Sequence, residues 1–271
     1  MNQIVNPIAI DRHSVRVSET LKRADLEALA AAEIIALRVP NYCDYFKRGS
    51  LIERITSNST IEYYKKATGV ARIGKALVET KSSSEDNDLY FSSALEQMHQ
   101  LRQICGNVLN PFDQFRLELD EQWRGGAQIA PFKRGKAFAG LLRIFEEGGF
   151  AHPHQDTLQR DAPGEPVAAE LLEQFAMNIY LQTSSVGGEL ELWDIRPSIE
   201  EYTALRNSAS HGIDKDKLPP SAALIKPQDG DLILFRSTNL HAVHKVEGQR
   251  RITWASFIGV RSPQEPLLLW S

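Results

Sequence analysis

The chain contains little cysteine and no long apolar run. Its 271 residues include only two cysteines, Cys43 and Cys105, which excludes a disulfide framework and a cysteine-based metal site. No stretch approaches the roughly 18 consecutive apolar residues that a membrane-spanning helix needs. Residues 1–13 also lack the basic and apolar segments of a secretion signal. We therefore expect a protein of a reducing compartment, the cytoplasm, that has no membrane partner.

An excess of basic charge is also missing. The 31 Lys and Arg residues are outnumbered by 35 Asp and Glu residues, and the formal net charge of −4 gives no general attraction to nucleic acid. Hydrophobic residues make up 42% and charged residues 24%, which is ordinary for a soluble globular protein. We therefore expect a small-molecule partner and no nucleic acid, whereas the sequence leaves the oligomeric state open.

The first 125 residues have the pattern of a mainly helical region. Stretches rich in helix-forming residues begin after polar residues or at a proline, and one of them closes at a glycine, as helices commonly do. Helices are expected at residues 18–32, 41–55, 88–105 and from Pro111 onward. The apolar residues 33–39 before Pro40 fit a short buried strand better.

After Gly125 and Gly126 the sequence changes to short apolar runs separated by turn residues. Six strands are predicted, at residues 127–132, 136–147, 175–182, 187–195, 229–237 and 250–260. Their spacing, with one insertion at about 197–220, fits a jelly roll or a related barrel better than alternating β-α-β units. We predict an α+β fold with a mainly β core, a single domain of residues 1–271 in which a helical region (1–125) covers a β core (126–262).

His154, Asp156 and His241 carry the clearest chemical signal. Alternate side chains of an extended chain point to the same side, so the first two can direct an imidazole and a carboxylate at one ion. Residues 229–246 predict a strand that delivers His241 at its far end, and strands remote in sequence can lie side by side in a barrel. Two imidazoles and one carboxylate form the facial set of ligands typical of non-heme Fe(II). His244 is the competing third ligand, and we expect it at the rim of the site.

These residues resemble the non-heme Fe(II)/2-oxoglutarate-dependent oxygenases. The resemblance covers about residues 137–260 and is carried by HQD at 154–156, HAVHKV at 241–246 and GQR at 248–250. It implies a double-stranded β-helix, or jelly roll, in which the three residues named above hold Fe(II) and 2-oxoglutarate chelates the iron. Arg250 matches the arginine that pairs with the distal carboxylate of this cosubstrate. Arg251 is the alternative, because a shift of one residue turns a strand side chain to the other face.

The resemblance also implies a reaction. O2 and 2-oxoglutarate are consumed, succinate and CO2 are released, and an unactivated C–H bond is hydroxylated. Halogenating relatives carry a small residue in place of the carboxylate to admit chloride, so Asp156 favours hydroxylation, or a related desaturation or cyclisation. The layout of the chain is loosely similar to bacterial oxygenases of free or N-acylated amino acids, which makes such a compound the expected substrate.

Arg143, Asn178 and Tyr180 are expected to make further contacts with the cosubstrate. Arg143 stands in an apolar run and needs a counter-charge. A carboxylate of 2-oxoglutarate or of the substrate would supply it, and the alternatives are Glu146 or an acid of the helical region. Asn178 and Tyr180 share one face of their strand, which looks either into the barrel or away from it.

Two alternative interpretations stay open from the residues alone. HPHQD at 152–156 is similar to the start of the zinc site in metallo-β-lactamase-like hydrolases, although that motif usually continues with a histidine where this chain has Thr157. His152 is otherwise a residue near the site or a surface histidine. A cupin-like metal-binding module without turnover would use the same barrel and triad, but it would have no use for Arg250.

Overall fold

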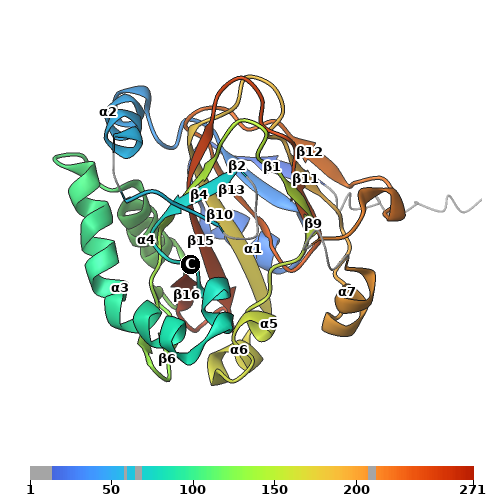
Figure 1. Cartoon of the computed structure of the whole chain (residues 1–271). Coiled ribbons are helices and arrows are strands. Elements are labelled where there is room, and N and C mark those ends of the chain that lie inside the picture. Colours follow the sequence, from blue (N-terminus) through green and yellow to red (C-terminus); the bar gives the residue numbers. More distant parts are fainter. Residues whose placement is uncertain (1–13, 58–59, 65–68, 207–211) are drawn as a thin grey trace, which may run out of the picture.

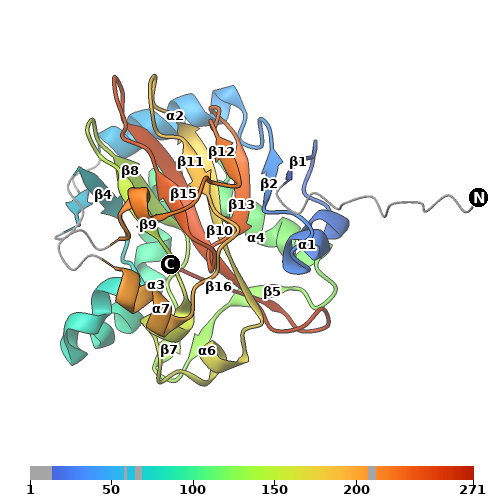
Figure 2. The same cartoon turned by 90° about the vertical axis from the view of Figure 1, so that its right-hand side faces the viewer.

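Two mainly antiparallel β-sheets face each other in the computed structural model, which describes residues 14–57, 60–64, 69–206 and 212–271 (Figures 1 and 2). The N-terminal segment in which we looked for a secretion signal lies outside these residues. The larger sheet consists, in spatial order, of β1 (Val15–Val17), β2 (Ala36–Val39), β13 (Leu232–Arg236), β10 (Glu173–Gln182), β15 (Arg251–Val260), β8 (Leu141–Phe145), β4 (Val70–Ile73) and β3 (Glu62–Tyr63). The smaller sheet consists of β12 (Ala223–Ile225), β11 (Leu190–Leu192), β14 (His241–Val243) and β9 (Ala151–His154).

The chain passes repeatedly from one sheet to the other. β8, β10, β13 and β15 lie in the larger sheet, whereas β9, β11, β12 and β14, which come between them in sequence, lie in the smaller one. The prediction of one strand from residue 229 to His241 is therefore wrong. The chain turns at residues 237–240, so that β13 and β14 belong to different sheets.

Helices cover the outer face of the larger sheet. Figure 1 shows α2, α3 and α4 on the side of this sheet that faces away from β9, β11 and β12. The helices of the first half are α1 (Arg23–Ala30), α2 (Tyr45–Thr56), α3 (Ser84–Cys105) and α4 (Pro111–Gln122). α3 begins four residues earlier than predicted because the Ser83 side chain caps it, accepting a hydrogen bond from the Asp86 amide. It ends before Gly106, as predicted, with that glycine at a φ of 60°.

Alternation along the strands divides the apolar side chains between two layers. Leu142 of β8 and Trp254 of β15 belong to the large core beneath the helices, together with Phe115 of α4. On the opposite face, Phe235 of β13 packs with Leu190 of the smaller sheet between the two sheets. This inner layer leaves room at one end of the sandwich, where the candidate site lies.

The first half contributes more than helices. β1 to β4 extend both edges of the larger sheet, and β16 (Leu267–Trp270), which follows the predicted core, pairs with β15 and with β5 (Ala127–Ile129). The insertion at 197–220 contains the short helix α7 (Ile199–Leu205). The remaining elements are a hairpin of β6 (Pro131–Phe132) and β7 (Gly135–Lys136), the helices α5 (Leu158–Asp161) and α6 (Pro166–Glu170), and the 3-10 turns η1 (Leu77–Ser82) and η2 (Lys215–Lys217). Within the described part of the chain, no helix combines the length and apolarity needed to cross a membrane.

Candidate metal centre

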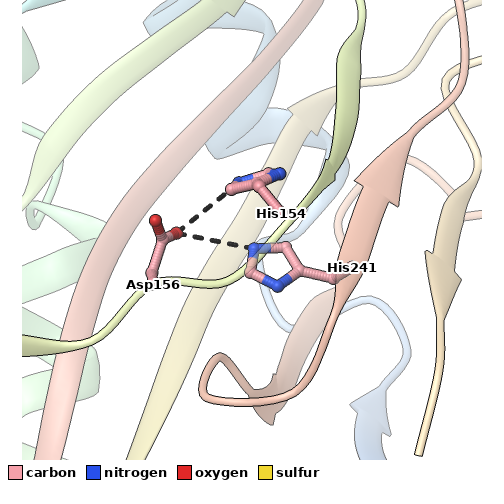
Figure 3. Close-up of side chains that lie close together, drawn as sticks. All are labelled: His154, Asp156 and His241. Atoms are coloured by element: carbon pink, nitrogen blue, oxygen red, sulfur yellow. Dashed lines mark ion pairs between the residues drawn. The ribbon is translucent and has the colours of Figure 1, made fainter. Parts of the chain in front are cut away.

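β9 and β14 are neighbours in the smaller sheet, and their pairing sets His154 directly opposite His241. Asp156 follows two residues after His154, where β9 has ended, and its side chain turns back toward both rings (Figure 3). Its Oδ2 atom lies 3.7 Å from Nε2 of His154 and 3.5 Å from Nε2 of His241. One ligand atom of each residue lies within 4.8 Å of the others. The structure thus brings together the three residues that the sequence pattern singled out.

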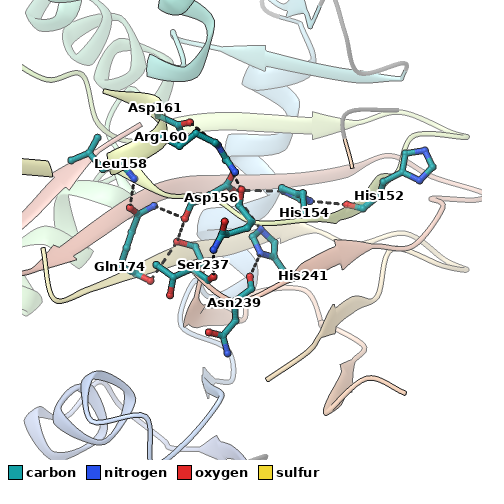
Figure 4. Close-up of polar contacts among 12 residues, drawn as sticks. His152, His154, Asp156, Leu158, Arg160, Asp161, Gln174, Ser237, Asn239 and His241 are labelled. Atoms are coloured by element: carbon teal, nitrogen blue, oxygen red, sulfur yellow. Dashed lines mark hydrogen bonds and ion pairs between the residues drawn. The ribbon is translucent and has the colours of Figure 1, made fainter. Parts of the chain in front are cut away.

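Backbone carbonyls hold both imidazoles. Nδ1 of His154 lies 2.7 Å from the His152 carbonyl oxygen, and Nδ1 of His241 lies 3.0 Å from that of Asn239 (Figure 4). A carbonyl oxygen only accepts hydrogen bonds, so Nδ1 carries the proton in each ring. The lone pair of each Nε2 atom is then free beside the Asp156 carboxylate, which is the state that a metal ligand requires.

A residue of β10 and a residue of the turn after β13 hold the Asp156 backbone. Its amide donates to the Ser237 carbonyl at 2.9 Å, and its own carbonyl accepts from Gln174 Nε2 at 3.2 Å (Figure 4). Gln174 also accepts a hydrogen bond from the Leu158 amide, so one side chain of β10 holds the backbone just after the carboxylate at two points. A nitrogen of Arg160 lies 3.8 Å from Oδ1.

The electrostatics of the triad favour a neutral His154 ring and an ionised Asp156. Burial, with His241 as a smaller contributor, lowers the pKa of His154 to about 4. Burial raises the pKa of Asp156, but the two histidines and Arg160 more than offset it and hold that pKa below its usual range. Near neutral pH, His154 therefore presents a neutral imidazole and Asp156 a carboxylate, beside the second imidazole of His241. This donor set fits Fe(II) and leaves coordination positions open for other ligands.

Neither competing histidine belongs to the group. Within the described residues, the group consists of the three side chains named above. The His152 ring packs edge-on against Phe150, with centroids 4.8 Å apart, and points away from the triad (Figure 4). A zinc site built on HPHQD would need this ring as a ligand, so the geometry disfavours the hydrolase interpretation. His244 bonds Glu191 at 2.7 Å, outside the triad as expected.

Arg251, and not Arg250, lines the cavity of about 460 Å³ that extends from the triad between the sheets. Arg250 lies away from the cavity wall, and its Nε pairs with Glu146 at 3.2 Å. Arg251 is 2% exposed. Its guanidinium lies 5.0 and 4.8 Å from the ring centroids of Phe145 and Tyr180. Arg251, the alternative to Arg250 in the sequence analysis, is therefore the one of these two arginines that lines the cavity.

Two polar atoms beside this arginine lack partners. Nε of Arg251 and Oγ1 of Thr253, two residues along on the same face of β15, are buried and have no hydrogen-bond partner among the described residues. Buried polar groups are nearly always hydrogen-bonded, so these two atoms are suited to a ligand that accepts hydrogen bonds. A carboxylate has the acceptor oxygens that both atoms need. Thr253 was not predicted, although its position two residues after Arg251 is the signal that identifies it.

Of the other residues predicted to contact the cosubstrate, two line the cavity and one contacts Arg251. Asn178 and Arg143 line the cavity. Tyr180 is fully buried, and its hydroxyl accepts a hydrogen bond of 3.1 Å from the Arg251 guanidinium. It therefore holds the arginine in place. Glu146 pairs with Arg250 and does not neutralise Arg143. The cavity also includes residues of the first half that the sequence did not single out, among them Tyr64, Leu77 and Val78.

A family model, described as the carrier-protein-independent halogenase WelO5, matches residues 27–271. No curated protein matches the chain significantly.

Several solved structures are similar to this one. An N-substituted L-amino acid dioxygenase from Burkholderia ambifaria AMMD, also solved in complex with α-ketoglutarate, gives a TM-score of 0.63 at 19% identity, covering 92% of this chain and 91% of the other. HygX from Streptomyces hygroscopicus, solved with nickel and 2-oxoglutarate bound, gives 0.50 at 11% identity, covering 89% and 87%. A 2OG-Fe(II) oxygenase family oxidoreductase from Burkholderia pseudomallei gives 0.50 at 12% identity, covering 93% and 99%. At these identities the likeness shows a shared fold.

Proposed function

The chain belongs to the family of the carrier-protein-independent halogenase WelO5, and from this premise we propose that it is an Fe(II)/2-oxoglutarate-dependent dioxygenase that hydroxylates a small molecule. The predicted resemblance to these oxygenases is confirmed by the family match. Hydroxylation is our own proposal, because the family model carries the name of a halogenase. The jelly-roll arrangement that we infer for the fold is supported by the alternation of β8 to β15 between the two sheets.

The carboxylate at position 156 is the observation that carries this proposal. A halogenating centre of this kind keeps a small residue there, so that chloride can occupy the position. In this chain Oδ2 of Asp156 lies within 3.7 Å of Nε2 of both His154 and His241 and fills that place. The three remaining coordination positions suffice for a bidentate oxo acid and for O2.

His154, Asp156 and His241 would hold the iron through two Nε2 atoms and one carboxylate oxygen. When bound, Fe(II) supplies the redox chemistry by which O2 and 2-oxoglutarate yield succinate, CO2 and an oxidised substrate. The chain keeps the ligands ready for this: backbone carbonyls fix the tautomer of both rings. Gln174 holds the Asp156 backbone by donating to its carbonyl oxygen, and the Phe235 ring lies 4.9 Å from that of His241.

We propose that Arg251 and Thr253 bind the distal carboxylate of 2-oxoglutarate. The unpartnered Arg251 Nε and Thr253 Oγ1 atoms supply two donors for one carboxylate, and Tyr180 holds another nitrogen of the guanidinium. Because Arg251 lies on the cavity wall between two aromatic rings, its side chain is restrained before the cosubstrate enters. This restraint reduces the conformational entropy that the side chain loses when the cosubstrate binds.

The proposed substrate is a free or N-acylated amino acid. The similar fold of an enzyme described as acting on N-substituted L-amino acids supports this class. The cavity offers both surfaces that such a compound needs, since its wall includes polar Asn178 and Arg143 as well as apolar Leu77, Val78 and Phe150.

The experiment is a substrate screen with the Fe(II)-loaded protein in air. Free and N-acetylated amino acids are added with 2-oxoglutarate, and substrate-stimulated succinate is measured together with product mass. The proposal expects at least one compound that stimulates succinate formation and gains one oxygen atom. An Asp156→Ala variant is the matched control and should form no succinate above background.

A metal-binding module without turnover is the alternative from a different class. A purely structural metal site has no use for a cavity arginine with an unsatisfied nitrogen, and this disfavours the alternative. Thermal stabilisation by the metal, with no stabilisation by 2-oxoglutarate and no succinate from any compound, would favour it.

A further inference from the structure

Arg143 places a second guanidinium in the cavity, and no carboxylate neutralises it. The residue lies on β8, lines the cavity and is close enough to the triad to help lower the pKa of His154, after burial and His241. Among the residues that the structure describes, no acid forms an ion pair with Arg143. Unpaired cations are seldom kept at such positions, so the arrangement indicates an anion that comes with a ligand.

The neighbouring strand offers a direct comparison. Arg72 of β4 stands opposite Arg143 in the register of the larger sheet. Two carboxylates, those of Glu62 and Glu79, each lie 2.6 Å from the Arg72 guanidinium. Arg72 is therefore neutralised by acids of the protein. Arg143, directly opposite, has no such acid among the described residues and is available to an anionic ligand.

Tyr64 adds an independent observation. Its hydroxyl is buried and finds no hydrogen-bond acceptor among the described residues, although it lies near enough to Arg143 for a side-chain hydrogen bond to help lower its pKa. Burial raises the pKa of Tyr64, and the nearby charge of Arg143 acts against this rise. The Tyr64 ring is held 5.3 Å from the guanidinium of the paired Arg72. An unsatisfied phenol donor next to an unpaired guanidinium forms a site for a carboxylate.

This site borders the one that we give to 2-oxoglutarate, and its arginine comes from β8, the strand next to β15. Arg251 stands opposite Phe145 in the pairing of β15 with β8, whereas Arg143 stands opposite Thr253, two residues along. The cavity wall also includes the apolar side chains of Leu77, Val78 and Phe150. Val78 is 46% exposed and Phe150 41%, which places the mouth of the cavity at this end.

We propose that Arg143 and Tyr64 bind the carboxylate of the primary substrate. The substrate is then a small carboxylic acid with an apolar group that lies against Leu77, Val78 and Phe150. This proposal rests on the proposed function for its substrate, and it adds that the free carboxylate is the recognised group. An amide or ester of the same compound loses the charge-assisted hydrogen bonds and binds more weakly.

The test measures binding, independently of turnover. Protein loaded with Ni(II), which does not support oxidation, is titrated by calorimetry with 2-oxoglutarate and then with N-acetyl-L-leucine, N-acetyl-L-valine or N-acetyl-L-phenylalanine. Each acid is compared with its carboxamide. We expect at least one acid to bind about 10- to 100-fold more tightly than its carboxamide, the range given by hydrogen bonds to a charged group.

Variants test whether the preference for the acid over its carboxamide depends on Arg143 and Tyr64. Arg143→Met should remove it, Arg143→Lys should retain part of it, and Tyr64→Phe should reduce it several-fold. Arg250→Met is the matched control, because that arginine pairs with Glu146 away from the cavity and its loss should leave the preference unchanged. Thermal melting confirms that each variant is folded, and Tyr64→Phe tests the site without removing a charge.

Two results would overturn the proposal. One is that no acid of the panel binds better than its carboxamide. The other is that Arg143→Met weakens 2-oxoglutarate and leaves the preference for acids intact, which would place Arg143 on the cosubstrate. If instead 2-oxoglutarate fails to bind while the Arg143-dependent preference is present, the proposed function fails and the carboxylate site stands.

Discussion

His154 and His241 are a cross-strand pair in the smaller sheet, with ring centroids 4.2 Å apart. The pairing of β9 with β14, and not any local motif, therefore brings the second imidazole to the first. Because each Nδ1 is bound to a carbonyl of its own strand or turn, the sheet also sets the protonation of both rings. A metal ion held by both imidazoles would therefore link β9 to β14.

The first prediction concerns the carboxylate. Replacing Asp156 by glycine removes the one anionic ligand and opens its coordination position. We expect hydroxylation to be lost and Fe(II) affinity to fall by more than the roughly 10- to 100-fold that loss of an outer partner costs. Chloride should then bind in the open position, and calorimetry with and without chloride checks this. Unchanged hydroxylation in this variant would remove Asp156 from the proposed ligand set.

The second prediction separates the two adjacent arginines. Arg251→Met should raise the KM for 2-oxoglutarate about 10- to 100-fold, because a charge-assisted pair with the distal carboxylate is lost. Arg250→Met, at the surface beside Glu146, should leave that KM within about twofold, as surface ion pairs contribute little. Succinate formation against 2-oxoglutarate concentration measures both. A larger rise of this KM in Arg250→Met than in Arg251→Met would instead assign the 2-oxoglutarate carboxylate to Arg250.

The third prediction tests the support of the triad. Gln174→Leu removes the hydrogen bonds that brace Asp156 and Leu158, so Fe(II) affinity should fall about 10- to 100-fold. Gln182→Leu is the control on the same strand, because Gln182 Nε2 donates to the Arg250 carbonyl instead. Metal titration of both variants gives the comparison. Equal affinities would mean that the ligands hold their places without this glutamine.

The fourth prediction follows from the two thiols. Burial raises the pKa of Cys43 to about 11, with the Asp44 charge adding to it, and burial likewise raises the pKa of Cys105 to about 12. Because both pKa values are raised, the reactive thiolates are scarce at pH 8 and both side chains are also sterically shielded. A chromogenic disulfide reagent should therefore react slowly with the native protein and rapidly with both cysteines in denaturant. Rapid reaction of the native protein would contradict the described burial.

The sequence predicted which three residues come together in the triad, but it did not predict which arginine lines the cavity. Strand geometry explains both results. His154 and Asp156 follow the two-residue period of an extended chain, which any strand obeys. The choice between Arg250 and Arg251 depends on register instead, and β10 shifts register against β15 between Tyr180 and Gln182, next to this position. Such an irregularity has no local signature, although it decides which side chain faces inward.

Short strands and distant contacts explain the other differences. β9 and β14 have four and three residues, too few for a periodic pattern to be recognised. Tyr64 and Leu77 reach the cavity from the first half of the chain, through packing that no motif near the triad reveals. The long strands β10 and β15 and the capped helices were predictable because period and end signals agree over many residues.

The most direct measurement of the central claim is the mass of the product formed under ¹⁸O2, with Fe(II), 2-oxoglutarate, chloride and a substrate found in the screen. With Asp156 in place, the account predicts a product that carries one ¹⁸O atom and no chlorine, together with one succinate for each product molecule. A chlorinated product, or an oxidised product formed without 2-oxoglutarate, would contradict it.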